Sequence, residues 1–513
     1  MNQPEVPPTP PLPSSRFHQH RGRGNSISSI SSATSGPSSS LHRSGGSTEY
    51  AASALLRDFA MFAEEKLNWV LNHTLDYEPD MTSRLHHGAD PEFDRVLAML
   101  GSVARQRPKP IIDALMIWRK SKSEPPEIMQ TLGGRNGREP YPLILERNSL
   151  ASIFILCRAL IAVVGSLPRG ALSQELGQKL EEMVFNQLIA IKPDEIDRGK
   201  NRQAILSLFA ELIGVLGELR FASVSDRFIA ELEKLPGDTD AKVNRKTEMV
   251  IRSMRFLQLK IYPEAALEET SDFLQSLAKF FSRAHSVKVK HAYAELFAGM
   301  LLPLAPKATA EVNYPGWAAA VETLYPKASK MALKPKHWQV AHPLQATLLC
   351  VSRRAHFLER WLTFIETALH PPRRSSSRHL AQALGSVSRL VWVYLYRCQE
   401  SYTASTKKLD IVVKLLFPPG RRMPVGSSSD SGSEDHARIL YLLSMKDLAH
   451  TTRTILLPLM GFHGELASTG SEETLDPMVP LDALLPERSM LALWAFLACY
   501  AEMERGEMKP AFP

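Results

Sequence analysis

Few side chains in this 513-residue sequence have the types and spacing that catalysis or metal binding requires. Two histidine pairs, His18 with His20 and His86 with His87, offer imidazole nitrogens to a metal ion. Neither pair has a second group of Cys, His or carboxylate side chains at ligand spacing, which a closed metal site needs. Solvated histidines are therefore the expected state, and we expect no metal site.

A glycine-rich segment at 133–137 could be taken for a phosphate-binding loop. A P-loop follows a strand and ends in Gly-Lys-Ser or Gly-Lys-Thr, and this segment does neither. The sequence also lacks a nucleophile elbow, a zincin helix and a kinase catalytic loop. We expect no catalytic residue, no cofactor and no enzymatic activity. An enzyme in an atypical helical fold is the alternative that measured turnover would revive.

Basic side chains gather in three places along the chain. The clusters are Lys288/Lys290/His291, Lys334/Lys336/His337 beside Trp338, and Arg373/Arg374/Arg378. A nucleic-acid reader concentrates such groups with aromatic platforms on one face. These clusters lie near expected helix ends and loops, where cations also favour helix C-termini. Solvated loop charge is the expected state, an acidic protein or lipid surface is the second interpretation, and no specific nucleic-acid partner is expected.

The polar segments contain patterns that protein kinases read. Arg21 and Arg23 precede Ser26 in the order R-x-R-x-x-S, which suits a basophilic kinase, and Thr9 precedes a proline. Ser431 and Ser433 lie near acidic residues. Phosphate in such segments changes the charge without disturbing the fold. We therefore predict a regulated tail, with Ser26 and Thr9 as its phosphorylation sites.

The composition is that of a chain with an ordinary core and a mild basic bias. Hydrophobic residues make up 44% of the sequence, and the net charge is +7. The four cysteines are far apart, without metal or redox spacing, and buried thiols are expected. The N-terminus has no apolar stretch of a secretory signal. The apolar run at 150–164 is too short to span a bilayer and contains Arg158. We expect a cytoplasmic protein without a transmembrane segment.

The elements that position these side chains are expected to be amphipathic helices. Apolar residues recur every three or four positions, which places them on one face of a helix. Two such stripes are Leu380/Leu384/Val387/Val391/Tyr394/Cys398 and Ile205/Leu208/Phe209/Leu212/Ile213/Leu216. A proline inside a helix costs about 3 kcal/mol, so we expect the prolines in connectors or first turns. They stand at Pro193, Pro236, Pro263, Pro315, Pro335, Pro343 and Pro371.

The chain divides by composition into four parts. These are a disordered Ser/Pro/Arg-rich tail at 1–48, a helical-repeat domain at 49–420, a flexible loop at 421–435 and a further helical segment at 436–513. We expect helices at 49–75, 90–103, 110–119, from 146 onward, 171–191, 201–217, 223–235, 240–261, 264–283, 286–305, 317–332, 343–352, 355–369, 378–399, 403–416, near 436–461 and at 486–505, with an exposed loop at 121–142. Ser223 with Asp226 fits a helix-start capping pair.

This pattern predicts an all-α fold. Strand-like runs are few and short, and no strict sequence repeat is present. Helix lengths and connector spacing suit degenerate HEAT or armadillo units of about 40 residues. We therefore predict an α-solenoid, in which each layer of helices buries its apolar stripe on the next layer.

Long stretches of the chain, in order, resemble the N-terminal region of the Furry-type cell morphogenesis proteins. The resembling stretches include DPEFDRVLAMLGSVA (90–104), ERNSLASIFILCRALIAVV (146–164), FAELIGVLGELRFASVSDRFIAEL (209–232), MRFLQLKIYP (254–263), KHAYAELFAGMLLPLA (290–305), EVNYPGWAAAVETLY (311–325), HPLQATLLCVSRRAHFLERW (342–361), SRLVWVYLYRC (388–398) and KLLFPPG (414–420). The resemblance covers residues 49–420.

The resemblance implies a non-enzymatic scaffold for cell polarity, polarised growth and cell morphogenesis. Such a scaffold supports an NDR-type kinase and its Mob coactivator at the cell cortex, at sites of polarised growth. A karyopherin-like transport adaptor is the alternative, because it is also a helical solenoid. The pI near 9.1 argues against it, since such adaptors are normally acidic.

The sequence departs from this family in its length. Family members are several times longer than 513 residues. A solenoid normally ends in a polar cap. The last helix instead has an apolar stripe of Met490, Leu493, Trp494, Leu497 and Tyr500. We therefore expect these side chains to be uncovered, in a fragment of a longer protein or in a chain that needs a partner there.

Overall fold

The computed structural model describes residues 43–74, 77–123, 141–192, 199–235, 240–369, 377–417, 431–464, 475–477, 486–505 and 510–513. Contacts divide the chain into two units, Met1–Glu49 and Tyr50–Pro513. In the first unit the described residues are the start of α1. All elements below belong to the second unit, apart from that first part of α1.

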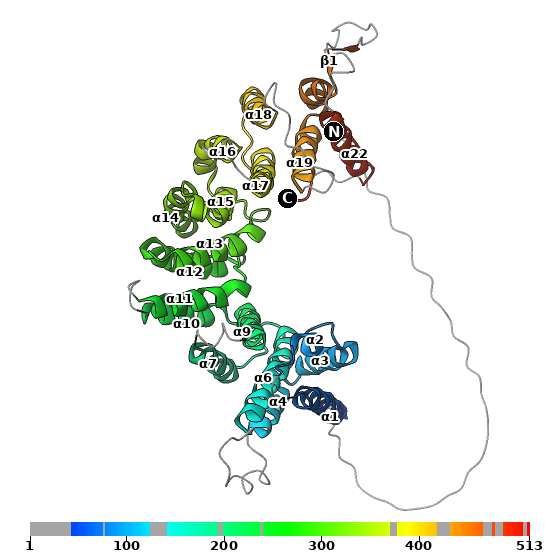
Figure 1. The fold of residues 1–513 in the computed structure, drawn as a ribbon, viewed down its shortest axis with the longest axis vertical. Helices are drawn as coiled ribbons and strands as arrows, with labels where there is room; N and C mark the ends of the chain where they lie inside the picture. Colours follow the sequence, from blue (N-terminus) through cyan, green and yellow to red (C-terminus); the bar gives the residue numbers. More distant parts are fainter. Residues whose placement is uncertain are drawn as a thin grey trace, which may run out of the picture. The chain divides into compact units, whose positions relative to one another are not determined.

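Nearly every described element is a helix (Figure 1). The elements are α1 (Arg43–Leu71), α2 (Thr82–Leu85), α3 (Pro91–Ala104), α4 (Pro108–Ser123), α6 (Tyr141–Gly165), α7 (Gln174–Ala190), α9 (Lys200–Leu219), α10 (Phe221–Glu233), α11 (Ala241–Ser253), η1 (Met254–Phe256), α12 (Glu264–Arg283), α13 (Val287–Leu301), η2 (Leu302–Leu304), η3 (Glu311–Asn313), α14 (Pro315–Ala332), α15 (Pro335–Cys350), α16 (Arg354–Leu369), α17 (Ser377–Tyr396), α18 (Tyr402–Leu416), α19 (Ser431–Lys446), α20 (Leu448–Thr451), η4 (Thr452–Leu456), α21 (Leu457–Leu459), β1 (Phe462–Gly464), β2 (Leu475–Pro477) and α22 (Pro486–Arg505).

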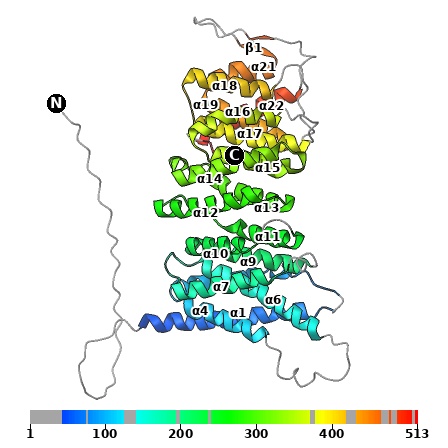
Figure 2. The same ribbon diagram turned by 90° about the vertical axis from the view of Figure 1, so that its left-hand side faces the viewer.

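The helices from α9 onward form two rows of stacked neighbours. One row runs α9, α11, α13, α15, α17, α19 and α22, each in contact with the next. The other contains α10, α12 and α14 in the same relation. Figure 2 shows α12 and α13 side by side at one level, and α14 and α15 at the next. Layers that bury their stripes on their neighbours are the defining feature of a solenoid, so the predicted all-α solenoid is confirmed.

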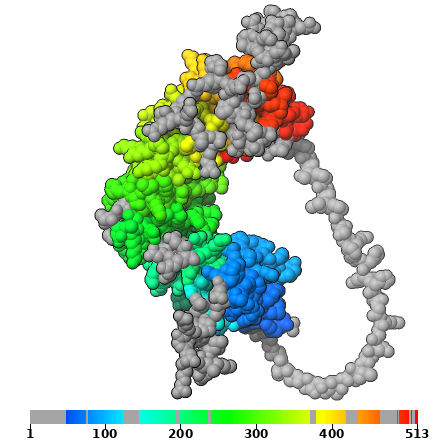
Figure 3. All heavy atoms as spheres, viewed as in Figure 1, coloured from blue at the N-terminus to red at the C-terminus, as the bar shows by residue number. Residues whose placement is uncertain are grey.

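The core is a continuous cluster of apolar side chains along these layers. Both predicted stripes belong to it: every member is buried except Leu380, which is half-buried. In the space-filling view the spheres of adjacent layers, from green to yellow, touch without a gap on the face shown (Figure 3). Periodicity predicted this burial because one helical face must lose its contact with water.

The apolar helix α6 is a core helix of this stack. The predicted apolar run at 150–164 was too short a reading of this helix, because its segment Ile144–Gly165 is long and apolar enough to cross a membrane by length and composition alone. It packs against α3, α4 and α9. Arg158 in its middle is buried and lies 2.5 Å from Asp94 Oδ1, and the Arg147 guanidinium donates to three backbone carbonyls. These polar contacts are with protein, as expected for a helix buried among other helices.

Long basic side chains join consecutive layers by capping helix ends. Lys327 of α14 donates to the carbonyl of Ala284, 2.7 Å away, just after α12. Arg397, just after α17, donates to the carbonyl of Cys350, 2.5 Å away, at the end of α15. The last carbonyls of a helix lack intrahelical partners and carry partial negative charge, so a cation there satisfies both needs. Part of the basic composition therefore serves the fold.

The expectation that every proline lies in a connector or first turn was wrong at Pro343. Pro315 and Pro335 begin their helices as predicted, but Pro343 lies inside α15. Proline has no N–H, so the carbonyl of Gln339 loses its usual donor. The side chain of Gln382 in α17 donates to that carbonyl instead, at 2.8 Å. Pro326, which no pattern had singled out, also lies inside a helix, α14. Pro193, Pro236 and Pro371 fall outside the described residues.

Several predicted boundaries were also wrong. α10 begins at Phe221, and Ser223 donates to Glu181 Oε2 at 2.7 Å, so Ser223 and Asp226 are no capping pair. α15 begins eight residues before the predicted 343, because Pro335 and not Pro343 occupies its first turn. α11 ends at Ser253, followed by a short 3₁₀ turn.

The predicted polar segments are shorter than expected where the structure describes them. Residues 43–48 of the predicted tail belong to α1, and 431–435 of the predicted loop belong to α19. The loop predicted at 121–142 loses residues to α4 and α6 at its ends. Beyond η4, two three-residue strands pair antiparallel, with Phe462 opposite Pro477. The rest of these segments lies outside the described residues.

Gly214 of α9 allows η1 to approach closely. A Cβ built on Gly214 would lie 2.6 Å from the Phe256 Cβ and 2.7 Å from its carbonyl oxygen. Alanine is the better helix former by about 1 kcal/mol. We nevertheless expect Gly214→Ala to destabilise the protein by about 1–3 kcal/mol, because backbone must move. Gly299→Ala in α13, where a Cβ meets nothing within 4 Å, is the control and should be neutral or stabilising.

Urea unfolding followed by circular dichroism would compare the two glycine variants with the parent chain. Equal stability of Gly214→Ala and Gly299→Ala would contradict the close contact between α9 and η1.

Candidate protein-docking edge

The described histidines that could have bound a metal ion are not grouped with enough other ligands to do so. His87 Nδ1 lies 3.0 Å from Asp94 Oδ2, and His86 Nδ1 lies 2.9 Å from the carbonyl of His87. Over the part of the chain that the structure describes, no group of three or more His, Cys, Asp or Glu side chains could hold a metal ion. His18, His20 and the segment 133–137 lie outside that part.

The cysteine thiols are packing groups. All four are free and buried, as predicted. Burial raises the pKa of Cys157 and that of Cys350 to about 12, although a nearby guanidinium opposes the shift in each case. The thiolate is the reactive form of cysteine. These two thiols therefore stay protonated and inert at neutral pH.

Two of the predicted basic clusters meet in the structure. His291 in the second turn of α13 and His337 in the first turn of α15 lie with Nε2 and Nδ1 2.8 Å apart. They are 46 positions apart in the sequence. Because α13 and α15 are neighbours in the same row, their N-terminal turns lie on one edge of the stack. We call the N-terminal turns of α11, α13, α15 and α17 the basic edge.

An aromatic and histidine cluster extends this edge to α17. The ring of Trp338 stacks on His342, with centroids 4.5 Å apart, and lies edge-on to His379 of α17 at 4.4 Å. Burial, with His379 nearby, lowers the pKa of His342 to about 3. Neither ring nitrogen of His342 has a hydrogen-bond partner among the described residues. His342 is thus a neutral packing group that joins α15 to Phe364 of α16.

The lysines of the basic edge carry uncompensated charge. Lys288, Lys334 and Lys336 are exposed and Lys290 is half-buried. None of the four forms an ion pair with a described residue. Burial, and after it the positive charge of His291 and the lysines, lowers the pKa of His337. A positive potential of this kind favours an anionic partner and speeds its association.

The remaining predicted sites fall partly or wholly outside the described residues. Arg373 and Arg374 lie outside them, and Arg378 is in the first turn of α17. Thr9 and Ser26 also lie outside, so their phosphorylation stays a prediction. Sequence reasoning missed His342 and His379. The available signal for His342 was Trp338 four positions earlier, but the expected helix began only at 343, and no aromatic residue lies one turn from His379 in the sequence.

The last helix carries the uncovered apolar stripe that the sequence predicted. Met490, Leu493, Trp494, Leu497 and Tyr500 are 41–60% exposed. The opposite side of α22 packs on α19. Residues 510–513, at the end of the predicted helical segment 436–513, form no helix and lie against α17, where the Trp392 indole donates to the carbonyl of Pro510 at 2.9 Å.

The sequence matches a protein-family profile and curated proteins. The sequence profile of a family described as "Cell morphogenesis N-terminal" matches residues 146–513. The chain is 33% identical over 459 residues to cell morphogenesis protein PAG1 of Saccharomyces cerevisiae, covering 72% of this chain and 19% of that protein. It is 32% identical over 416 residues to cell polarity protein mor2 of Schizosaccharomyces pombe, covering 78% of this chain and 18% of that protein.

The chain therefore spans about one fifth of the length of these curated relatives. Their names describe morphogenesis and polarity and name no reaction. The match over 146–513 includes the segment after residue 420, where the sequence alone showed no resemblance. Profile and relatives agree with the resemblance found in the helical blocks, and this chain belongs to the Furry-type cell morphogenesis family, whose N-terminal region it matches.

Proposed function

We propose that this chain is a non-enzymatic scaffold in cell morphogenesis, polarity and polarised growth, which supports signalling by an NDR-type kinase and its Mob coactivator. Family membership supports the role in morphogenesis. One structural observation carries the idea of a scaffold: a stack of helix layers presents an edge on which Lys288, Lys290, Lys334 and Lys336 form no ion pair with a described residue. The kinase and the coactivator are the partners that the family resemblance implies.

The mechanism is co-localisation. A solenoid offers many separate surfaces along its layers, so two partners can bind without displacing each other. Each bound partner then experiences a raised effective concentration of the other, and the overall avidity exceeds either single affinity. This mechanism needs rigid placement of surfaces and no catalytic group. We place the scaffold in the cytoplasm, at the cell cortex where polarised growth occurs.

Direct binding tests this proposal. The purified full chain would be titrated with a purified NDR-type kinase–Mob complex in a calorimeter, with a kinase of another group as the control. We expect a dissociation constant in the micromolar range or tighter for the NDR-type complex only, which corresponds to about 8 kcal/mol of binding free energy. Reproducible absence of binding at micromolar protein would contradict direct support of the kinase by this chain.

A further inference from the structure

A pocket opens where the basic edge passes from α11 to α13. It has a volume of about 500 Å³ and lies between the layer of α10 and α11 and the layer of α12 and α13. Its apolar lining comes from α10, α12 and α13 or their ends and includes Ile229, Leu232, Phe280 and Val289, whereas α11 contributes the polar Asn244 and Thr247. A space of this size accommodates one or two bulky side chains.

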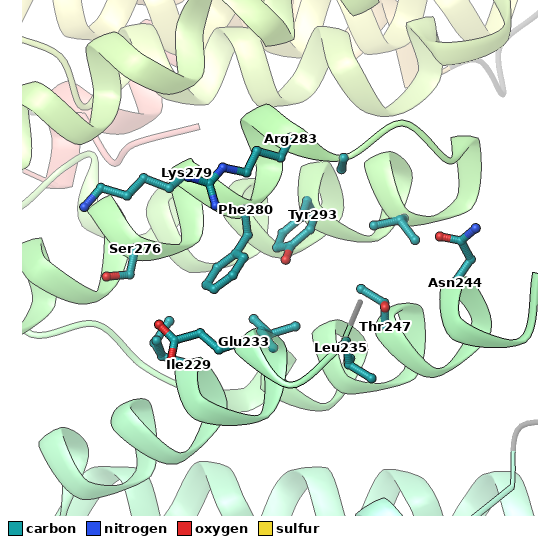
Figure 4. Close-up of a pocket in the computed structure, with 13 residues that line it drawn as sticks. Ile229, Glu233, Leu235, Asn244, Thr247, Ser276, Lys279, Phe280, Arg283 and Tyr293 are labelled. Carbon is teal, nitrogen blue, oxygen red and sulfur yellow. The ribbon is translucent and has the colours of Figure 1, made fainter. Parts of the chain in front are cut away.

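The pocket also offers polar groups that the fold does not use. Tyr293 is only 2% exposed, and its hydroxyl has no hydrogen-bond partner among the described residues. Figure 4 shows this hydroxyl directed into the pocket beside the ring of Phe280, with Asn244 and Thr247 at one end. The side-chain amide of Asn244 has no partner among the described residues either. The hydroxyl is reached from the pocket, so a ligand seated there can form a hydrogen bond with it.

The rim of the pocket is basic. Lys279 and Arg283 of α12 line it, and neither forms an ion pair with a described residue. One carboxylate, Glu233, lies on the opposite wall (Figure 4). Further cations without described carboxylate partners lie at the starts of the neighbouring helices, from the N-cap to the second turn: Lys242, Lys246, Lys288, Lys290, Lys334 and Lys336. Among the residues that line the pocket, two cations therefore stand against one carboxylate.

We propose that this pocket and the basic edge around it bind an acidic peptide segment of a partner protein, with one bulky apolar side chain seated between Phe280 and Ile229. The inference deepens the proposed scaffold function and rests on it. Carboxylates of the segment would pair with Lys279 and Arg283, and the Tyr293 hydroxyl would bond its backbone. A concave apolar site with polar groups inside favours a peptide, because a bilayer presents a flat surface.

The test uses a short labelled peptide of Glu and Asp with a central Phe, titrated against the purified full chain by fluorescence anisotropy. We expect saturable binding that weakens at least tenfold when Ala replaces the Phe, or when Lys replaces the acidic residues. Raising the salt concentration from about 0.1 M to about 1 M should also weaken it, because the screening length falls from about 10 Å to about 3 Å. A peptide that fails to bind at millimolar concentration overturns the inference.

Variants of the pocket locate the binding. The double charge reversal Lys279→Glu with Arg283→Glu should weaken peptide binding at least tenfold. Its control reverses Lys109 and Lys407, two exposed lysines of α4 and α18 without described ion pairs, and should leave binding unchanged. If both double variants weaken peptide binding equally, the net charge of the protein explains the loss, and binding at this pocket is excluded.

Two further variants separate the apolar hole from the charge. Ser276→Trp fills the pocket from α12 and should abolish the advantage of the central Phe. Tyr293→Phe keeps the packing and removes the hydroxyl, so it should weaken the peptide by about fivefold, as expected for one hydrogen bond, with no loss of thermal stability. Unchanged affinity in both variants contradicts seating in this pocket.

Two comparisons distinguish the outcomes. Sedimentation with phosphatidylserine vesicles that depends on Lys279 and Arg283, without peptide binding, would overturn the peptide in favour of a membrane. The kinase–Mob complex would be titrated against the same variants. Binding equal to that of the parent chain would leave the scaffold function intact and exclude this pocket as its site. If the kinase–Mob complex binds neither the parent chain nor any variant, the proposed scaffold function is contradicted, whether or not the peptide binds.

Discussion

Replacing Arg158 with methionine is expected to lower the stability of the layer of α3 and α6 by about 3–5 kcal/mol, the usual cost of breaking a buried ion pair. Arg158 Nη2 lies 2.5 Å from Asp94 Oδ1, and Nη1 lies 2.7 Å from the carbonyl of Leu85. The side chains of Arg158 and Asp94 are only 9% and 16% exposed. Removal of the guanidinium leaves a desolvated carboxylate and an unpaired carbonyl.

Hydrogen exchange of the α3 and α6 amides measures this loss as a fall in the free energy of opening. The double variant Arg158→Met with Asp94→Asn should recover at least half of it, because the buried charge is gone and Gly88 keeps its acceptor. Arg95→Met removes an exposed arginine of α3, the helix of Asp94, that pairs with Glu92, and should change stability by at most about 0.5 kcal/mol. A loss below about 1 kcal/mol for Arg158→Met would refute the assigned role.

The same pair has a pH signature. Burial disfavours the charged form of Asp94, but the hydrogen bonds from Arg158 and Gly88 outweigh burial and lower its pKa. A lowered pKa in the folded state adds stability above the unfolded value of about 3.9 and loses it as the pH falls through the folded pKa. The parent chain should therefore lose more stability than Arg158→Met below about pH 4.

Truncation of Trp361 to alanine is the second large effect, about 3–5 kcal/mol. Trp361 is fully buried between α16 and α17, where its ring stacks on Phe357 with centroids 5.7 Å apart and on Tyr394 at 4.3 Å. Alanine would leave a cavity and remove both ring contacts. In a solenoid the loss should stay local, so exchange should rise in α15 to α18 and remain unchanged in α3 and α6.

Two further substitutions test the reason for the Trp361 effect. Trp361→Phe keeps a stacked ring and removes an indole N–H that has no partner among the described residues, so it should cost less than half as much. Trp494→Ala removes a tryptophan that is 41% exposed on α22 and should cost about 1 kcal/mol or less. Equal losses for Trp361→Ala and Trp494→Ala would show that burial does not set the cost.

Local pattern was enough to predict most helices and much of the core. The stripes that contain Leu212 and Val391 are buried because helical periodicity alone decides which side chains share a face. Prediction failed where a distant residue changed the local rule. Pro343 is tolerated inside α15 because Gln382 replaces the lost donor, and Ser223 turns to Glu181 instead of capping its own helix. Neither partner is visible within a window of one helix.

The sequence predicted only separate parts of the candidate site. The clusters around His291 and His337 lie 46 positions apart and were each predicted to be solvated loop charge. The stack nevertheless brings Nε2 of His291 within 2.8 Å of Nδ1 of His337. Sequence reasoning also passed over the pocket, because Ile229, Phe280 and Val289 look like ordinary core residues. Their side chains line an opening only because two layers leave a space at their edge.

By itself the sequence determined the helices, their apolar faces, the buried thiols and the family, because these depend on residue types at short spacing or on ordered strings. The tertiary structure alone decided which helix starts share an edge, which cations cap the helix of another layer and which remain without a partner. The physical reason is that layer stacking sets these neighbours. The contact energies that select the stacking come from residues tens of positions apart, and a periodic stripe shows that a face is buried without showing what buries it.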